Sequence, residues 1–188
     1  MGYIKNIIGH TRNIIVHKFW VLYYACRLGI PVRGFMHDWS KFSPTEFWES
    51  VKYYQGTSSP IPACKEANGY SLAWQHHKGR NPHHYEYWID RIDEGGVPIR
   101  IPFEYVLEMI ADYLAAGRTY QGKKFTFQSE LDWWKGQRDQ RRMHEDTKKF
   151  LDIVFHYLSD HGFDKYFTKV ANETIYEYIE TIYPVIKF

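Results

Sequence analysis

The chain has 188 residues with 44% hydrophobic and 19% aromatic side chains, which suits one domain with a sizeable, aromatic-rich core. Its formal net charge of +2 is too balanced to indicate nucleic-acid binding. Its two cysteines form no CxxC motif, and we find neither a signal peptide nor a stretch of about 20 apolar residues that could span a membrane. We therefore expect a cytoplasmic protein with no membrane partner.

Hydrophobic periodicity and helix-capping residues predict helices along most of the chain, and therefore an all-α fold. In chain order, helices are expected at residues 3–28, 36–41, 43–54, 71–77, 81–92, 102–116, 128–159 and 164–183. Residues 56–69, rich in Gly, Ser and Pro, are expected to form a loop that could be a lid or a specificity element. Residues 93–102 and 122–126 are expected to be irregular.

We predict one compact helical bundle over residues 1–188, with core motifs at 10–120 and C-terminal helices at 128–183 packing on it. Single residues set several of the expected boundaries. Ser43 is predicted to cap a helix whose third position is Glu46, which is a capping box. Gly117 is expected to end the helix over 102–116, and Gly136 is a candidate interruption of the helix over 128–159.

Ten histidines stand out in the composition, because histidine is the commonest metal ligand. The adjacent His37 and Asp38 can meet one ion at a helix end or bend, and imidazole with carboxylate suits Mn, Fe, Mg or Zn. A lone His-Asp pair is more often an ordinary surface pair, so the interpretation depends on its context. His17 lies on the apolar face of the first predicted helix, and His10 shares that face, so either can point inward.

Four further histidines fall within nine residues, and they are His76, His77, His83 and His84. If residues 81–92 are helical, His84 lines up with Trp88 and Ile92 and points to the core. The same period places His83 at a wetter edge. So dense a group, divided between a helix end and a helix start, is difficult to interpret as scaffold alone.

Glu108 and Asp112 are four residues apart and share one face of a predicted helix among apolar neighbours. The simplest alternative is a pair of exposed acids, which these neighbours disfavour. Buried carboxylates need a partner, and a metal ion can be one.

The segments HDWSKFSPTEF, AWQHHKGRNPHHYEYW and EMIADYLAAGRTYQG resemble an uncharacterised family of bacterial and phage proteins, a domain of unknown function, over roughly residues 10–145. That resemblance implies no established activity. In the order His, His-Asp, His, His, Asp, the chain also resembles the HD-domain superfamily of metal-dependent phosphohydrolases. Its segment from His37 to Lys41 is similar to the superfamily's His-Asp-x-Gly-Lys version, with Ser40 in place of glycine.

The HD resemblance implies one or two divalent metal ions, which could be Fe, Mn, Mg or Zn. The first ion would be bound by His17, His37, Asp38 and Asp112. The second would be bound by His77 and His84, with Asp38 bridging. His76 and His83 stay open as alternatives to His77 and His84. His10 stays open as an alternative to His17, because the spacing from His17 to His37 is short for the superfamily.

The HD resemblance predicts a metal-dependent phosphohydrolase that acts on a small phosphorylated molecule, with a nucleotide as one candidate. The metal would lower the pKa of a bound water and polarise the phosphoryl oxygen. Lys41 would contact the substrate phosphate as a point charge. His83 or Glu108 would act as an acid or base, or would orient a ligand.

Two other classes share these residues. Some HD-fold enzymes with a similar six-ligand order are di-iron oxygenases, and iron content with oxygen consumption would identify one. A non-catalytic module stabilised by metal is the third class, and a metal shell filled by protein ligands would favour it. The sequence does not set the oligomeric state.

Overall fold

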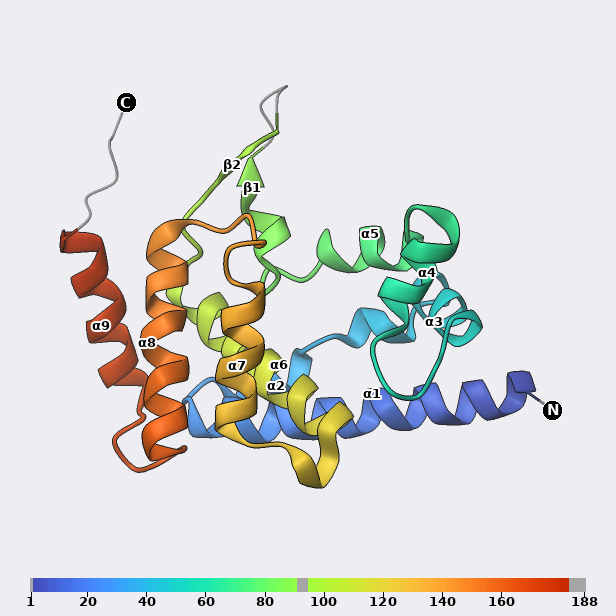
Figure 1. Cartoon of the computed structure of the whole chain (residues 1–188), viewed down its shortest axis with the longest axis horizontal. Helices are drawn as coiled ribbons and strands as arrows, with labels where there is room; N and C mark the ends of the chain where they lie inside the picture. The colour runs from blue at the N-terminus through green and yellow to red at the C-terminus, as the bar shows by residue number, and fades with distance from the viewer. Residues whose placement is uncertain (1, 91–94, 183–188) are drawn as a thin grey trace.

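The computed structural model describes residues 2–90 and 95–182, and these residues form an all-α fold (Figure 1). The helices are α1 (Gly2–Arg27), α2 (Pro31–Met36), α3 (Pro44–Lys52), α4 (Pro60–Asn68), α5 (Leu72–Lys78), α6 (Phe103–Gln121), α7 (Phe127–Gln137), α8 (Glu145–His161) and α9 (Lys169–Ile182). Short 3-10 helices are η1 (Trp39–Phe42), η2 (Tyr85–Trp88) and η3 (Gly122–Lys124). Strands β1 (Ile89–Asp90) and β2 (Val97–Pro98) pair antiparallel, with Ile89 opposite Pro98. The predicted fold class is confirmed.

The long helices α1 and α6 pack against each other at the centre of the molecule. Helices α3, α4 and α5 gather near the N-terminal end of α1, whereas α7, α8 and α9 stand side by side near its C-terminal end (Figure 1). The largest fully buried side chains of the core include Tyr24, Leu107, Ile110, Trp134, Phe150 and Phe155. Burial of large aromatic rings between these helices supplies much of the apolar area removed from water. No helix in the described ranges is long and apolar enough to cross a membrane.

Two of the predicted helix starts are built as expected. The Ser43 hydroxyl accepts a hydrogen bond from the backbone N–H of Glu46 at 3.4 Å, and the Ser71 hydroxyl accepts one from that of Trp74 at 3.0 Å. Each bond satisfies one of the free N–H groups at the start of a helix. Helix α1 also matches its prediction closely, because its periodic face is continuous.

The segment after α1 differs from the prediction. Instead of a helix over 36–41, helix α2 begins at Pro31 and ends at Met36, and a turn at His37 and Asp38 leads into η1. Gly34 lies inside α2 and faces α1. A Cβ at this position would stand 2.4 Å from the Cβ of Ala25 on α1, so a larger residue would not fit. This glycine allows a close contact between two helices and does not end one.

The loop predicted over residues 56–69 is also wrong, because most of it is α4. Ser59 is the N-cap, Pro60 takes the first turn, and Gly69 ends the helix with a φ of 80°. These are the residue types that flank helices. They have the same composition as a loop, and this similarity produced the error.

The helix predicted over 81–92 does not form in its described part, and Ile92 itself lies outside the described residues. A turn, η2 and β1 take its place. The indole Nε1 of Trp88 donates a hydrogen bond to the carbonyl oxygen of Pro82 at 2.6 Å, which folds this segment back on itself. The helical period used to separate His83 from His84 therefore does not apply.

Three boundaries in the C-terminal half also differ or are refined. Helix α6 continues past Gly117 to Gln121, and a Cβ on Gly117 would stand 2.2 Å from a carboxylate oxygen of Glu130. The helix predicted over 128–159 is divided into α7 and α8, but Gly136 is not the interruption, because it lies within α7, which ends at Gln137. Helix α9 begins at Lys169, later than predicted, and its predicted end at residue 183 lies outside the described residues.

Candidate metal centre

The metal ligands predicted from the sequence come from several parts of the fold and meet between α1, α5 and α6. They are His17 on α1, His37 and Asp38 in the turn after α2, His77 on α5, His84 before η2, and Asp112 on α6. Each of them is buried or half-buried. The structure thus brings together residues that are up to 95 positions apart in the chain, since His17 and Asp112 are direct neighbours.

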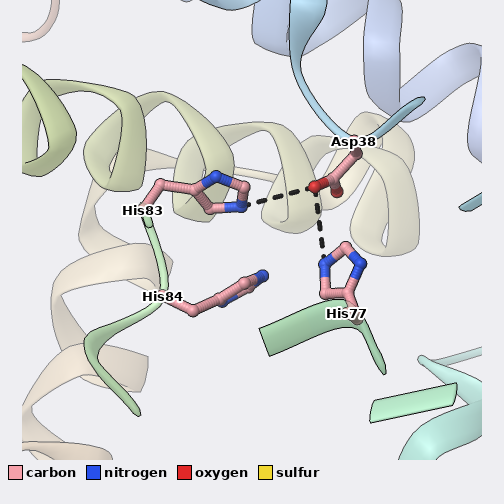
Figure 2. A group of neighbouring side chains, drawn as sticks. All are labelled: Asp38, His77, His83 and His84. Atoms are coloured by element: carbon pink, nitrogen blue, oxygen red, sulfur yellow. Dashed lines mark ion pairs between the residues drawn. The ribbon is translucent and has the colours of Figure 1, made fainter. Parts of the chain in front are cut away.

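Asp38 lies at the middle of this cluster with 1% of its surface exposed. Its Oδ1 is 3.4 Å from Nε2 of His77 and 3.4 Å from Nε2 of His83 (Figure 2). Its Oδ2 is 3.1 Å from Nε2 of His37 and 2.6 Å from Nζ of Lys41. Asp38 is also the one non-glycine residue of the described chain with a positive φ, of 54°. Such backbone conformations concentrate at functional sites, where the surroundings enforce them.

One group of four possible ligands contains His17, His37, Asp38 and Asp112, with ligand atoms that all lie within 4.8 Å of one another. Oδ1 of Asp112 is 3.0 Å from Nε2 of His17 and 3.5 Å from Nε2 of His37. This set is the one the HD resemblance implied for the first ion. His10, the alternative to His17, belongs to no such group among the described residues.

A second group contains Asp38, His77, His83 and His84, again with ligand atoms within 4.8 Å. His77 belongs to it and His76 does not. Both His83 and His84 belong to it, and their rings lie on the same side of Asp38 as that of His77 (Figure 2). The prediction that His83 sits at a wetter edge is wrong, because His83 is 1% exposed and His84 is the more exposed of the two.

Six side-chain atoms of these groups are buried without hydrogen-bond partners in the part of the chain that the structure describes. They are Nε2 of His17, His37, His83 and His84, and both carboxylate oxygens of Asp38. Buried polar atoms in proteins are nearly always hydrogen-bonded, so six such atoms in one cluster require an explanation. Short distances without hydrogen-bond geometry are what lone pairs aimed at a common point produce. The donor set could hold a metal ion.

Glu108 contacts two of the imidazoles, those of His37 and His83, at their Nδ1 atoms. Its Oε1 accepts a hydrogen bond from Nδ1 of His37 at 3.0 Å and lies 3.1 Å from Nδ1 of His83. Burial alone would raise the pKa of Glu108, but the contacts with the two histidines lower it to about 2. Because an ionised carboxylate can only accept, the Nδ1 atoms that face Glu108 carry protons, which leaves the Nε2 atoms to face Asp38. This is how carboxylates orient metal-binding histidines.

Glu46 orients His77 in the same way, although the sequence pattern predicted a different role for this glutamate. Its Oε2 accepts from Nδ1 of His77 at 2.7 Å, and its Oε1 accepts from Nδ1 of His76 at 2.6 Å. The sequence pattern placed this side chain in a capping box with Ser43. The hydroxyl half of that box forms, whereas the carboxylate turns to the histidines. An acid eight residues after Asp38, in the first turn of the next helix, was the signal available.

The cluster buries more negative than positive charge. Its buried carboxylates are Asp38, Glu46, Glu108 and Asp112. Burial opposes ionisation of Asp38, but the charges of His37, Lys41 and His77 outweigh it and hold the pKa of Asp38 well below its usual value. Burial and the charge of Lys41 lower the pKa of His17 to about 4, so its imidazole is neutral. Burial would lower the pKa of His37, but the charge of Asp38 and hydrogen bonds to the carboxylates raise it well above its usual value, so an ion at its Nε2 would displace a proton.

Lys41 lies at the boundary between the cluster and a cavity of about 190 Å³. Its side chain is 29% exposed, and Asp38 and Asp112 raise its pKa against the effect of burial. His17, His77, His84 and Asp112 also line this cavity. A molecule in the cavity would therefore meet both ligand groups and the ammonium together.

A family model described as a family of unknown function, DUF5662, matches residues 6–156. The chain belongs to this family. The DUF5662 match includes both ligand groups, Glu46, Glu108 and Lys41, and it brings no activity with it. No curated protein and no solved structure gives a significant match. The resemblance to the HD superfamily stays a prediction that depends on the order of the ligands.

Proposed function

We propose that this DUF5662 chain binds two divalent metal ions and hydrolyses a phosphate ester. The observation that carries the proposal is the meeting of two ligand groups at Asp38, with Lys41 beside them on the wall of a cavity. Divalent ions at such residues supply Lewis acidity and activate water at neutral pH. Paired metal ions that share a carboxylate are typical of phosphate-ester hydrolysis.

The other side chains of the site would bind the phosphate or orient the metal ligands. Lys41 binds the phosphate oxygens as a point charge from the cavity side. Glu108 and Glu46 hold the ligand imidazoles with their Nε2 atoms toward Asp38. His83, expected from the sequence to act as an acid, a base or an orienting residue, serves as a ligand. Glu108 serves as a positioning residue and does not touch the substrate.

The test is a set of phosphate monoesters and diesters, assayed with protein reconstituted separately with Mn, Fe, Zn and Mg. We expect phosphate release that depends on the metal and disappears with a chelator. His156→Ala, at an exposed histidine on α8, is the matched control and should behave as the wild type. Oxygen consumption without phosphate release would instead assign the centre to oxygen chemistry. If both assays were negative, the protein would be a binding module that metal stabilises.

A further inference from the structure

The cavity beside the centre extends along α1 from His17 to His10, and its walls come from α1, α4, α5 and α6. Beyond the ligand groups its lining includes Asn13, Ile61, Trp74, Ala116 and Tyr120. The lining is mostly apolar away from Asp38. One end is therefore charged, at Lys41 and the ligand groups. The rest of the wall is mostly apolar and also presents polar side chains at His10, Asn13, Ser50 and Ser59.

His10 has no role in the centre, yet it is built like a binding group. Only 7% of its surface is exposed, and its Nε2 is buried without a hydrogen-bond partner within the described ranges. Its ring packs against Phe47 and Tyr54, with ring centres 5.5 and 6.0 Å away. Burial, followed by the charge of Lys41, lowers its pKa to about 4, so the imidazole is neutral. A neutral imidazole offers one donor and one acceptor.

The position of His10 limits the size of a molecule that reaches both ends. His10 and His17 are seven residues apart on the same face of α1, which corresponds to roughly 10 Å at 1.5 Å per residue. The cavity of about 190 Å³ is smaller than the ~300–1,000 Å³ pockets that enclose drug-sized ligands, the size class of nucleotides. A short molecule with a slim body fits these dimensions better than a nucleotide.

Resting on the proposed hydrolysis, we propose that the cavity takes a compact phosphate monoester with a mostly apolar body, and that His10 hydrogen-bonds a polar group at the far end of that body. Lys41 and the ligand groups bind the phosphate. His10 thus selects the substrate by its length and its distal polar group. A buried imidazole without a partner discriminates against a body that lacks such a group, because the imidazole then stays unsatisfied.

Binding of phosphonates to the metal-loaded protein tests this proposal without requiring turnover, since a C–P bond replaces the hydrolysed ester bond. The probes are ω-hydroxyalkyl phosphonates of two to six carbons and alkyl phosphonates of equal length without the hydroxyl, measured by calorimetry. We expect one chain length to bind best in the wild type. At that length the hydroxyl should strengthen binding roughly two- to tenfold, which is the effect of one net hydrogen bond.

The variants separate His10 from general effects on the fold. His10→Leu should lose the preference for the hydroxyl, and His10→Gln, which can still hydrogen-bond, should keep part of it. His156→Leu carries the same change at an exposed position and should retain the wild-type preference. Thermal unfolding of each variant verifies that the fold is kept.

Several results would overturn the proposal. These are an unchanged hydroxyl preference in His10→Leu, no chain-length optimum in the wild type, or adenosine monophosphate binding as tightly as the best phosphonate. Failure of the proposed function looks different: the phosphonate preference would be present and would depend on His10, but the matching phosphate esters would not be hydrolysed.

Discussion

Helix α6 and residues 79–90 each contribute to the centre, but the fold holds them in different ways. The residues of α6 from Val106 to Ala115 are all buried, so Asp112 is positioned by a helix packed into the core. Residues 79–90 have no such support. The Asn81 side chain donates to the carbonyl oxygen of His77 at 2.8 Å, and the Trp88 indole donates to that of Pro82 at 2.6 Å. A packed helix thus positions Asp112, whereas His83 and His84 lie in an irregular segment that side-chain contacts hold in place, among them the contact of Glu108 with His83.

The two ligand groups can be separated by single substitutions, and this is the largest expected effect. His17→Ala removes a ligand from the group on α1 and α6, and His84→Ala removes one from the group on α5 and residues 79–90. Each variant should lose one of two ions. His83→Ala should match His84→Ala, because both histidines belong to the same group. Metal analysis of dialysed protein measures this, and loss of both ions in His17→Ala or in His84→Ala would show that the groups form a single site.

Lys41 tests whether the centre acts on phosphate. Its side chain lies on η1 and makes no contribution to the core, so Lys41→Ala should keep the metal and the fold. Loss of a charge that stabilises the reacting phosphate should reduce kcat/KM for a phosphate ester on the order of a hundredfold. Lys52→Ala, at an exposed lysine on α3, is the control. Full activity in Lys41→Ala would remove the phosphate-binding role from this lysine.

The two positioning glutamates sharpen the comparison further. Glu108 contacts His37 of one group and His83 of the other, whereas Glu46 contacts only His77 among the ligands. Glu108→Gln should therefore lower the affinity for both ions by about 10–100-fold, the usual effect of losing such a partner. Glu46→Gln should lower the affinity only for the ion of the group that contains His77. Competition with a chelator measures both affinities, and equal effects of the two variants on both ions would contradict the division into groups.

Glu130 on α7 lies against Gly117 of α6 and tests the surroundings of α6 away from the ligands. Burial, followed by the charge of Asp112, raises its pKa to about 8. The folded chain then holds a proton that the unfolded chain has lost, so stability should fall as pH rises from about 5 through 8, by at most ~1.4 kcal/mol per pH unit. Glu130→Gln should remove this slope in urea unfolding of the metal-loaded protein. Glu104→Gln, exposed at the start of α6, should leave it unchanged.

The sequence predicted those parts of the centre that depend on regular periodicity. His17 and Asp112 lie on continuous apolar helix faces, and the structure brings them to the His37-Asp38 pair as expected. Segment 81–90 was mispredicted because Asn81 and Pro82 are typical of a helix start. The pairing of Ile89 with Pro98 and the hydrogen bond from the Trp88 indole to Pro82 override that preference, and the residue types of a helix start encode neither contact.

Glu46 shows a second limit of prediction from sequence. A glutamate three residues after a serine N-cap has the same pattern whether its carboxylate returns to the cap or reaches a distant histidine. Only the packing of α3 against α5 decides between them, because it brings His77 within 2.7 Å. Local patterns therefore located the ligands but did not identify the residues that orient them.

The metal content of protein purified without added metal, and again after reconstitution, tests the central claim most directly. The wild type should approach two ions per chain after reconstitution. Asp38→Ala should fall to background because Asp38 belongs to both groups, and His37→Ala should lose at least the ion of its own group. Asp139→Ala, an exposed aspartate after α7, should match the wild type. A wild type that takes up no metal, or unchanged metal content in the His37 and Asp38 variants, would contradict the account.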